Sequence, residues 1–254
     1  MKIVLVGGGS GISPLLTELT QHGISATAIV TVFDDGGSSG ILRKRFDIPA
    51  VGDLRKNVSA TAGKIGKFFE KRVRGHALGN LILAELISEN GFEQATKKFS
   101  DFGAARVVPV SFSNSTLVGE LENGSKISGE SKFDHPPTKF KNKKIAKISL
   151  VPRAKLNPAI PKILATADKI VVGPGSVFGS LLANFAVDGF HAAFEKSRAQ
   201  KILVRNSADE FGCRGESSAE IQKRFGVEFD RILIPRKWEM RKILLVVAKN
   251  QIKS

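Results

Sequence analysis

The chain has 254 residues, of which 42% are hydrophobic and 25% charged, and its 39 basic and 24 acidic residues give a formal net charge of +15. This composition is typical of globular proteins and excludes disorder as the main state. No apolar run approaches the roughly 20 residues of a membrane-spanning helix. A single cysteine, Cys213, excludes an internal disulfide and a cysteine-based zinc site. We expect a soluble, cytoplasmic protein whose charge favours phosphate-bearing partners.

Basic residues cluster in three stretches, at 43–56, 135–162 and 236–242. The middle stretch holds eight bases and no acid. Lysine-rich runs are commonly solvated surfaces. Nucleic-acid binding is compatible with this charge, but no helix-turn-helix, zinc-finger or RNA-binding signature accompanies it. The partner of the middle stretch is therefore left open between acidic lipid, RNA and none.

The chain opens with a predicted strand–helix–strand unit. Lys2–Val6 is a short β-branched run that predicts a buried parallel strand. Ile12–His22 has apolar residues at helical spacing, and Gly23 predicts its end. Ala26–Phe33 predicts a second buried strand, which makes the unit a right-handed βαβ crossover.

The middle of the chain changes in texture. A helix is predicted over His76–Asn90, with Gly91 after its end. Arg106–Lys132 alternates apolar and polar residues around a turn at Asn123–Gly124, which predicts an antiparallel hairpin or meander. The parallel-strand texture returns at Lys144–Val151. We therefore expect a β-rich insertion at about 106–150.

The last third alternates strands and helices again. A helix is predicted from Pro158, and the final apolar run, Ile243–Ala248, is expected to be an edge strand. The alternation favours an α/β fold, with a Rossmann-like, doubly wound, mostly parallel sheet and a small antiparallel β insertion. We expect residues 1–254 to form a single nucleotide-binding domain. The remaining strands are predicted at Asp168–Val172, Lys201–Val204 and Arg231–Ile234.

The first candidate motif is the glycine loop Gly7–Gly11, which joins the first strand to the first helix. Glycines let the backbone approach a phosphate, and a helix N-terminus supplies free N–H groups. Ile12 stands where the dinucleotide fingerprint needs Gly or Ala, and no Lys-Ser/Thr follows as in a Walker loop. Phosphate binding is favoured over a simple tight turn, and an NAD-dependent oxidoreductase is disfavoured.

The second motif, Asp34-Asp35-Gly36-Gly37-Ser38-Ser39-Gly40, ends the second strand and should lie beside the first loop. Two adjacent acids exceed what a ribose clamp needs. Mg²⁺ takes one or two carboxylates together with phosphate oxygens, which fits this loop. Asp53 is a candidate third oxygen donor. The alternative is a solvated Asx turn.

Two further motifs begin helices. In Gly75–Asn80, His76 is a candidate acid/base or phosphate ligand, or simply a polar cap. Gly173-Pro174-Gly175-Ser176 is a second glycine loop at the end of a strand, and Phe178 after it could stack on a base or pack in the core. Together the two glycine loops could clamp a nucleotide diphosphate.

The motifs GGGSG, VFDDGGSSG, VGDLR, GHALGN and VVGPGSVFGS together resemble a known superfamily, from Met1 to about Asn206. It joins 2-phospho-L-lactate transferase of deazaflavin coenzyme biosynthesis with the bacterial gluconeogenesis factor. The longer DDGGSSG and GPGS loops are closer to the gluconeogenesis-factor branch. The resemblance implies a Rossmann-like fold with the nucleotide on the glycine loops.

The resemblance also implies ligands for each branch. In the transferase branch, the positions of Asp34 or Asp35 and of Asp53 hold Mg²⁺ beside a GDP-type donor. In the factor branch a UDP-sugar is contacted by the aromatic residue at Phe178, where Tyr is usual. The chain departs from the family pattern at Ser10, at His76-Ala77, and at 210–216, which only loosely matches a family segment.

Two functions follow from this resemblance. The first is a UDP-sugar-binding regulatory factor of gluconeogenesis and cell shape. The alternative is a Mg²⁺-dependent transferase that moves a phospho-acyl group to an alcohol, with Asp34, Asp35 or His76 as candidate catalytic residues. No surplus of aromatic residues is present to line a flavin-like acceptor pocket, which favours the factor, and a homo-oligomer is compatible with either.

The site residues expected from the motifs and the resemblance together fall into two groups. The metal-binding candidates are Asp34, Asp35 and Asp53. The nucleotide-binding candidates are Gly7, Gly8, Gly9, Ser10, Gly11, Gly37, Ser38, Ser39, His76, Asn80, Gly173, Gly175, Ser176 and Phe178.

Overall fold

The centre of the protein is a six-stranded sheet with the strand order β11-β10-β9-β1-β2-β5. The computed structural model describes residues 1–206, 210–235 and 240–248. Every neighbouring pair in this sheet is parallel. The order runs outward from β1 in both directions, which confirms the predicted Rossmann-like, doubly wound fold. The strands are β1 (Ile3–Gly7), β2 (Ala26–Val30), β5 (Arg106–Pro109), β9 (Lys169–Val172), β10 (Gln200–Val204) and β11 (Arg231–Leu233).

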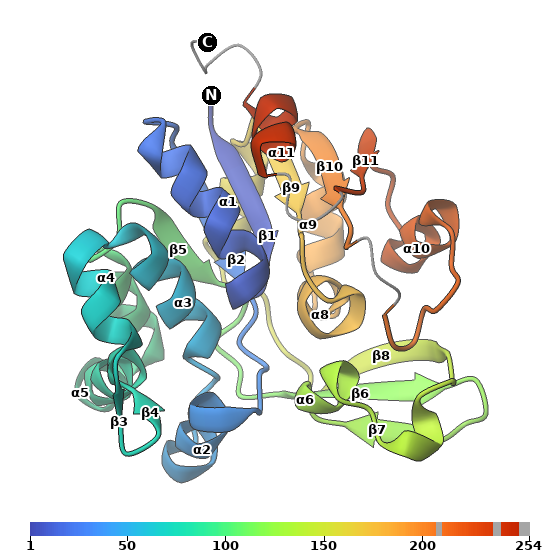
Figure 1. The fold of residues 1–254 in the computed structure, drawn as a ribbon, viewed down its shortest axis with the longest axis horizontal. Coiled ribbons are helices and arrows are strands. Elements are labelled where there is room, and N and C mark those ends of the chain that lie inside the picture. Colours follow the sequence, from blue (N-terminus) through green and yellow to red (C-terminus); the bar gives the residue numbers. More distant parts are fainter. Residues whose placement is uncertain (207–209, 236–239, 249–254) are drawn as a thin grey trace.

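Helices cover both faces of this sheet, so its central strands are buried on both sides. All five residues of β1 are buried. Figure 1 shows α1 and α11 in front of the sheet and α9 behind it. The helices are α1 (Gly9–Gln21), α2 (Gly37–Phe46), α3 (Gly52–Thr61), α4 (Gly63–Glu70), α5 (Leu78–Ser100), α6 (Ser131–Asp134), α7 (Ile160–Ala165), α8 (Ala183–Phe185), α9 (Phe190–Lys196), α10 (Ser218–Phe225) and α11 (Met240–Val247), with a 3₁₀ turn at Thr138–Phe140 and a π-helix at Val177–Leu182.

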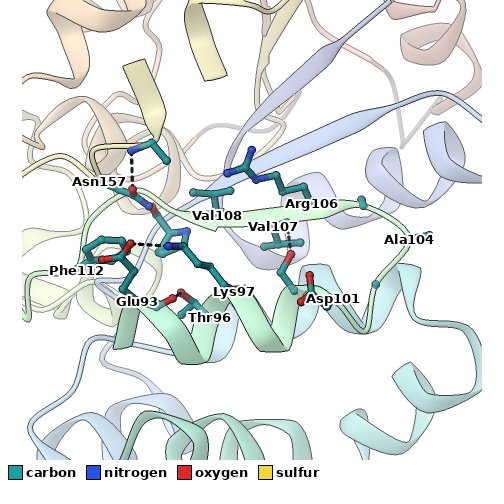
Figure 2. Close-up of a pocket in the computed structure, with 15 residues that line it drawn as sticks. Glu93, Thr96, Lys97, Asp101, Ala104, Arg106, Val107, Val108, Phe112 and Asn157 are labelled. Carbon is teal, nitrogen blue, oxygen red and sulfur yellow. Dashed lines mark hydrogen bonds and ion pairs between the residues drawn. The ribbon is translucent and has the colours of Figure 1, made fainter. Parts of the chain in front are cut away.

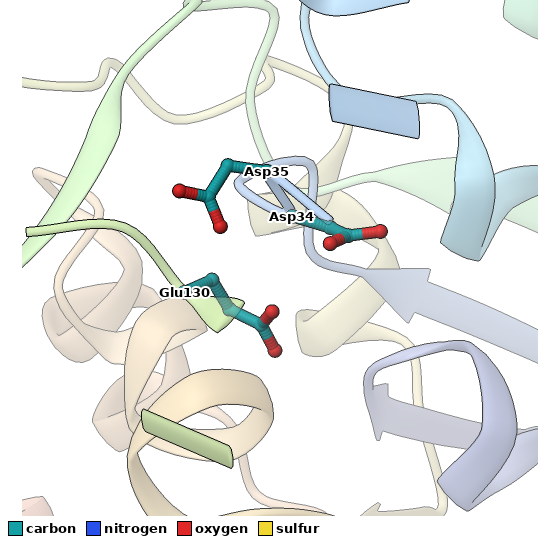
Figure 3. A group of neighbouring side chains, drawn as sticks. All are labelled: Asp34, Asp35 and Glu130. Atoms are coloured by element: carbon teal, nitrogen blue, oxygen red, sulfur yellow. The ribbon is translucent and has the colours of Figure 1, made fainter. Parts of the chain in front are cut away.

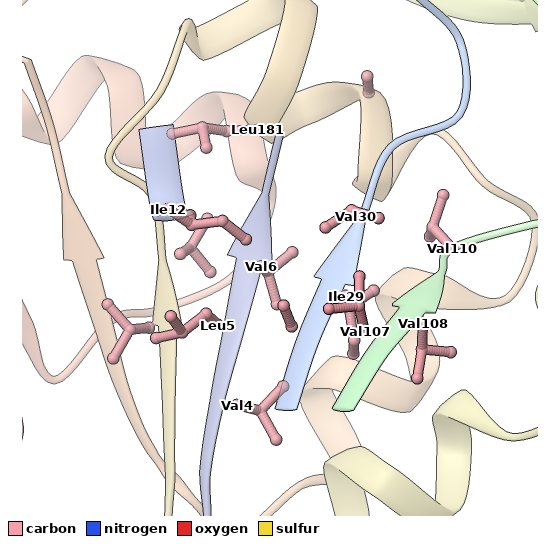
Figure 4. Close-up of a cluster of buried hydrophobic side chains, with 14 of the residues drawn as sticks. Val4, Leu5, Val6, Ile12, Ile29, Val30, Val107, Val108, Val110 and Leu181 are labelled. Carbon is pink, nitrogen blue, oxygen red and sulfur yellow. The ribbon is translucent and has the colours of Figure 1, made fainter. Parts of the chain in front are cut away.

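The core is continuous across the strands at the middle of the sheet. Figure 4 shows aliphatic side chains of β1, β2 and β5 side by side, together with Ile12 of α1 and Leu181 of the π-helix. Leu5, Val6, Ile12, Ile29 and Leu181 are all completely buried. Packing therefore fixes both helices that follow the glycine loops directly onto the sheet.

A small antiparallel sheet lies beyond the carboxyl ends of the parallel strands (Figure 1). It contains β6 (Thr116–Leu121), β7 (Lys126–Ser128) and β8 (Ile145–Val151), with β6 in the centre. Its inner face carries Leu117, Leu121, Ile127 and Ile145, all buried. A separate two-residue hairpin, β3 (Arg72–Val73) with β4 (His76–Ala77), precedes α5.

The β-rich insertion differs from its prediction in its start and in the pairing of its last strand. Arg106–Pro109 pairs in parallel with β2, so the antiparallel part begins only at Thr116. Lys144–Val151 is not a parallel strand, because β8 pairs antiparallel with β6. Only one face of β8 is buried, and its exposed residues include Val151, whose apolar character gave the run its parallel-strand appearance.

The predicted edge strand at Ile243–Ala248 is also wrong, because this run lies in and just after α11. Ile243, Leu244 and Val247 are buried while Leu245 is 51% exposed, which is a helical pattern. The helix predicted from His76 begins at Leu78, since His76 belongs to β4. Gly91, in the left-handed region at φ 73°, interrupts α5 where the helix was predicted to end.

None of the helices in the described part of the chain combines the length and the apolar character that crossing a bilayer would require.

Candidate functional site

Three loops gather at the carboxyl ends of the adjacent strands β9, β1 and β2. They are the glycine loop after β1 (residues 8–11), the acidic loop after β2 (31–36) and the glycine loop after β9 (173–176). The strand order reverses between β1 and β9, which is the point where doubly wound sheets bind their ligands. A side-chain carbon at Gly11 would collide with the carbonyl oxygen of Pro174, so the two glycine loops touch through their backbones.

Two buried amides hold the first glycine loop in place. Asn57 donates to the carbonyl oxygen of Gly8 at 3.3 Å, and Asn184 donates to that of Gly7 at 3.4 Å. Both side chains are completely buried, and their Oδ1 atoms have no hydrogen-bond partner. No side chain caps the N-terminus of α1 at Gly8. The first N–H groups of α1 are therefore left for another acceptor.

Lys56 brings an ammonium group to the rim of this loop. Lys56 Nζ donates to Ser10 Oγ at 3.1 Å and lies 3.9 Å from Asp53 Oδ1. A hollow of about 420 Å³ opens here, between α1, α3 and α4, and Ser10, Ser13 and Lys56 are among its lining residues. An anion at this helix N-terminus would meet N–H groups, hydroxyls and an ammonium group together.

The acidic loop forms a carboxylate cluster with a residue from the turn that follows β7 of the small sheet. Asp34, Asp35 and Glu130 each offer an oxygen atom within 4.8 Å of the others, and Figure 3 shows the three side chains as neighbours, with Asp34 and Asp35 directed to opposite sides of their loop. Asp34 Oδ1 accepts a hydrogen bond from the N–H of Gly36, and Asp35 Oδ1 accepts one from the N–H of Ser131, both at 2.8 Å. We call these three residues the acidic trio.

Burial and the charges of neighbouring acids raise the pKa values of Asp34 and Glu130. Burial first, and then the charge of Asp53, raise the pKa of Asp34 from 3.8 to about 6. Burial and neighbouring acids raise the pKa of Glu130 from 4.5 to about 9. Half-buried carboxylates that repel one another are a donor set that a hard cation such as Mg²⁺ would fit, since it supplies the missing positive charge.

Asp53, the predicted third ligand, lies outside this trio. Its Oδ2 accepts a hydrogen bond from Thr31 Oγ1 at 3.0 Å, and its side chain lies against the backbone of Gly8 and Gly9. Asp53 therefore lies between the first glycine loop and the acidic loop. A direct metal contact by Asp53 stays a prediction.

The second half of the DDGGSSG motif contacts the GHALGN motif, a meeting that the sequence did not predict. His76 Nδ1 lies 3.0 Å from Ser38 Oγ, and Asn80 Nδ2 donates to the same hydroxyl at 3.1 Å. Arg55 Nε in turn donates to Asn80 Oδ1 at 3.2 Å. The hydroxyl of Ser39 instead accepts a hydrogen bond from the N–H of Gly52, which ties α2 to α3.

The second glycine loop and the helix after it are held by their own Ser176 and by Glu210. Ser176 caps the following π-helix by accepting a hydrogen bond from the N–H of Gly179. Glu210 accepts from the N–H of Val177 at 2.6 Å and from Asn206 at 2.8 Å. Burial raises the pKa of Glu210, while these two hydrogen bonds favour its charged form.

Phe178, a candidate for base stacking, is only 3% exposed. The guanidinium of Arg224 lies 5.2 Å from the centre of its ring, and that guanidinium is bound by Glu216. A side-chain carbon at Gly212 would lie 2.9 Å from the ring, so the backbone also closes in on it. This environment favours the packing role of Phe178, and stacking on a base stays a prediction.

A further cleft lies away from the loops, at the edge of the sheet formed by β5. It has a volume of about 400 Å³ and lies between β5 and the second half of α5 (Figure 2). An ion pair of 2.7 Å between Lys97 and Glu93 crosses its wall. None of the residues predicted to bind nucleotide or metal lines this cleft.

Some site residues could not be found from motifs. Glu130 joins the trio from the turn between β7 and α6, where the N–H of neighbouring Ser131 donates to Asp35, 96 positions away in the chain. Asn57 and Asn184 bind backbone carbonyls, and because every residue has a carbonyl, such contacts produce no recognisable motif in the sequence. The one available signal was Glu210, at the start of the segment that only loosely matches the family pattern.

The titration of Glu130 has a consequence for stability. The folded protein keeps a proton on this carboxyl that the unfolded chain releases above about pH 4.5, since its pKa is raised to about 9. Its contribution to stability is thus complete below the unfolded pKa and is lost as the pH rises towards 9. Glu130→Gln should therefore melt at a higher temperature than the parent near pH 9, and the two proteins should melt at the same temperature below pH 4.5. Each kcal/mol would shift the melting temperature by about 2–4 °C.

Glu122→Gln is the matched control, because Glu122 is an exposed acid at the end of β6 in the same small sheet. Melting curves of both variants over this pH range, without divalent cations, make the comparison. Parallel pH profiles for the parent and Glu130→Gln would contradict the raised pKa.

Known proteins resemble this chain over most of its length. Residues 3–230 match the family described as "CofD: 2-phospho-L-lactate transferase CofD". The chain is 38% identical over 218 residues to a putative gluconeogenesis factor of Thermotoga maritima, covering 81% of this chain and 68% of that protein. It is 38% identical over 220 residues to the gluconeogenesis factor of Halalkalibacterium halodurans, covering 81% of this chain and 66% of the relative.

The chain thus spans about two thirds of the length of these two relatives. A solved structure gives the same result for the fold. A crystal structure of a UPF0052-family protein from Bacillus halodurans superposes with a TM-score of 0.85 at 33% identity, covering 97% of this chain and 85% of that one.

Proposed function

Because the chain belongs to the family of the 2-phospho-L-lactate transferase CofD and the gluconeogenesis factors, we propose that it binds a UDP-sugar between its two glycine loops. We further propose that it acts as a regulatory factor of gluconeogenesis and cell shape. The observation that carries the binding proposal is the backbone contact of Gly11 with Pro174 at the point where the strand order reverses. There a diphosphate can lie against both loops at once.

The diphosphate is the part of the ligand with the clearest support. The uncapped N-terminus of α1 offers N–H groups, and Lys56 and Ser10 lie beside it. A helix N-terminus and an ammonium group both favour negative charge. The net charge of +15 would also steer an anionic ligand towards the protein.

A divalent cation is the second part of the proposal. Asp34, Asp35 and Glu130 would hold Mg²⁺, and the ion would neutralise the diphosphate and the trio together. Asp53, which raises the pKa of Asp34 through its charge, would strengthen the attraction for the ion from its place behind the glycine loop.

The arrangement of aromatic side chains favours a regulatory factor over a transferase with a flavin-like acceptor. Phe185 packs against Phe190, Phe194 and Phe225 with ring centres 4.9 to 5.0 Å apart. Phe69 packs against Phe99 in the same way, at 5.0 Å. These rings fill cores and are not free to stack on a flat acceptor.

The alternative function, a Mg²⁺-dependent phospho-acyl transferase, draws on the acidic trio. A metal would stabilise charge on a diphosphate leaving group. His76, 3.0 Å from Ser38, or a carboxylate of the trio would take the proton of the acceptor alcohol. Turnover of a nucleoside diphosphate donor is the property that separates this alternative from the regulatory factor.

Calorimetric titration with UDP-N-acetylglucosamine, UDP-glucose, GDP and NAD, each with and without Mg²⁺, tests the proposal. We expect the two UDP-sugars to bind, more tightly with Mg²⁺, and to be recovered intact after incubation. Asp34→Asn should remove the Mg²⁺ effect, whereas Asp101→Asn, an exposed acid after α5, should keep it. Selective GDP binding would instead favour the transferase, and failure of all four ligands to bind would refute the proposal.

A further inference from the structure

A second surface of the molecule combines exposed apolar side chains with unpaired positive charge. It lies on α4 and the β3–β4 hairpin, residues 63–75, and we call it the α4–hairpin patch. Ile65, Phe68 and Val73 are 41%, 48% and 49% exposed. Five exposed bases surround them, namely Lys64, Lys67, Lys71, Arg72 and Arg74.

The exposure of this patch follows from how α4 is held. The helix buries only Gly66 and Phe69. Gly66 rests directly on the carbonyl group of Ser59 in α3, and Phe69 packs against Phe99 and Phe102 with ring centres 5.0 and 5.4 Å apart. These contacts hold α4 without help from its outer side chains, so Ile65 and Phe68 are not needed for the fold.

The hairpin next to α4 exposes two more side chains of the patch, Val73 and Arg74, to solvent. Arg74 and Gly75 form its two-residue turn, with φ angles of 49° and 83°. Such turns with two positive φ angles give tight, well-defined hairpins. Arg72 donates to the carbonyl oxygen of Gly75 at 2.7 Å, which closes the turn further. Val73 and Arg74 are therefore displayed at the tip of a firm loop.

The charge of the patch is almost entirely uncompensated. Its one acid, Glu70, pairs with Arg55 of α3. Within the described part of the chain, none of the five exposed bases forms an ion pair with an acid. The patch therefore carries five positive charges that a partner has to match.

A neighbouring helix extends the same character. Ser38 of α2 and His76 of β4 are 3.0 Å apart, and Figure 1 shows α2 at the same end of the molecule as the hairpin. On α2, Ile41 is 56% and Phe46 is 49% exposed, beside the exposed base Arg45. The guanidinium of Arg45 lies 5.6 Å from the centre of the Phe46 ring.

We propose that the α4–hairpin patch docks this protein onto an anionic lipid bilayer. Basic side chains would meet the lipid phosphates, and Ile65, Phe68 and Val73 would enter the boundary between headgroups and acyl chains, as in interfacial binding segments. A second copy of the chain is disfavoured, since two such patches would bring like charges together. RNA is disfavoured as well, because Ile65 and Val73 have no aromatic face for stacking and Lys71 already lies 6.0 Å from the ring centre of Phe68.

Sedimentation with vesicles tests this proposal on the full chain. Vesicles of mixed phosphatidylglycerol and phosphatidylcholine should bind the protein, and vesicles of phosphatidylcholine alone should not. The double variant Lys64→Gln/Lys67→Gln should bind about 25-fold more weakly, because each base near an anionic surface contributes about fivefold. The double variant Lys139→Gln/Lys141→Gln removes two exposed bases from the other basic stretch and should bind like the parent.

The apolar contribution needs its own variant. Phe68→Ser should weaken binding to the mixed vesicles at every salt concentration, whereas Val151→Ser, which changes an apolar side chain 56% exposed on β8, should not. All four variants change exposed residues, so unchanged melting temperatures would show that they fold. Equal binding of the parent to both kinds of vesicle, or loss of binding only in the Lys139/Lys141 variant, would overturn the proposal. Two other results would also overturn it, each in a parent protein that does not bind vesicles. One is binding of polyuridylate that the Lys64/Lys67 variant loses, and the other is self-association that this variant loses.

Discussion

Gly9→Val should abolish binding of a UDP-sugar. A side-chain carbon at this position would lie 2.5 Å from Asp53 Oδ1 and 2.6 Å from the Lys56 side chain, so valine has to push the first turn of α1 away from α3. The displaced turn can no longer direct its N–H groups at a phosphate. Loss of two such hydrogen bonds to a charged group, each worth about 1.5–3 kcal/mol, amounts to a loss of affinity of about a hundredfold or more.

The same substitution strains the packing, and overpacking costs about 1–3 kcal/mol of stability on its own. Gly103→Val is therefore the matched control. A side-chain carbon there would lie 2.7 Å from Thr61 Oγ1, a similar crowding at the opposite edge of the sheet. Calorimetry should find normal affinity in Gly103→Val and none in Gly9→Val. Affinity in Gly9→Val equal to that of the parent would remove the phosphate from the first glycine loop.

Phe178→Ala should lower the free energy of unfolding by about 3–5 kcal/mol, the usual cost of deleting a buried aromatic ring. The ring is 3% exposed, and its removal leaves Arg224 and Gly212 facing a cavity. Urea denaturation measures the effect. Phe46→Ala, which deletes a ring that is 49% exposed, should change stability by about 0.5 kcal/mol or less.

Phe178→Leu separates packing from stacking, because leucine restores most of the apolar volume without an aromatic face. We expect it to recover much of the lost stability and to keep the affinity for the UDP-sugar. A Phe178→Leu protein that is stable but binds the UDP-sugar several-fold more weakly would mean that the ring stacks on the ligand, and would contradict the packing role.

Much of the parallel sheet was predictable because its strands are buried on both faces. Lys2–Val6 reads as an uninterrupted apolar run for this reason, and it forms β1 at Ile3–Gly7. The same rule fails for Ile243–Ala248, since a short apolar run looks alike in a buried strand and in a buried helix. The rule also misses Arg106–Pro109, which was assigned to the antiparallel insertion but pairs in parallel with β2, because that pairing is set by tertiary contacts.

The residues of the candidate site also fall into those that motifs predict and those that depend on tertiary contacts. Ser38, His76 and Asn80 were each candidates from their own motifs, but their contact with one another is seen only in the structure. Glu130 could not be assigned from its own neighbourhood, because its role depends on where the small sheet lies relative to β2. The buried amides Asn57 and Asn184 act on backbone carbonyls, and such a contact requires no particular residue on the loop side.

The acidic trio is divided between two sheets, and this has a mechanical consequence. Asp34 and Asp35 follow a strand of the parallel sheet, whereas Glu130 lies in the turn that follows β7 of the antiparallel one. Without a cation, burial and the neighbouring acids keep a proton on Glu130, and the hydrogen bond from the N–H of Ser131 to Asp35 joins the two parts. A bound cation would act as a latch between the sheets. Ion binding would then change how firmly the small sheet is held against the parallel sheet. A change of this kind would transmit the presence of the ion to the surface without any covalent bond being broken.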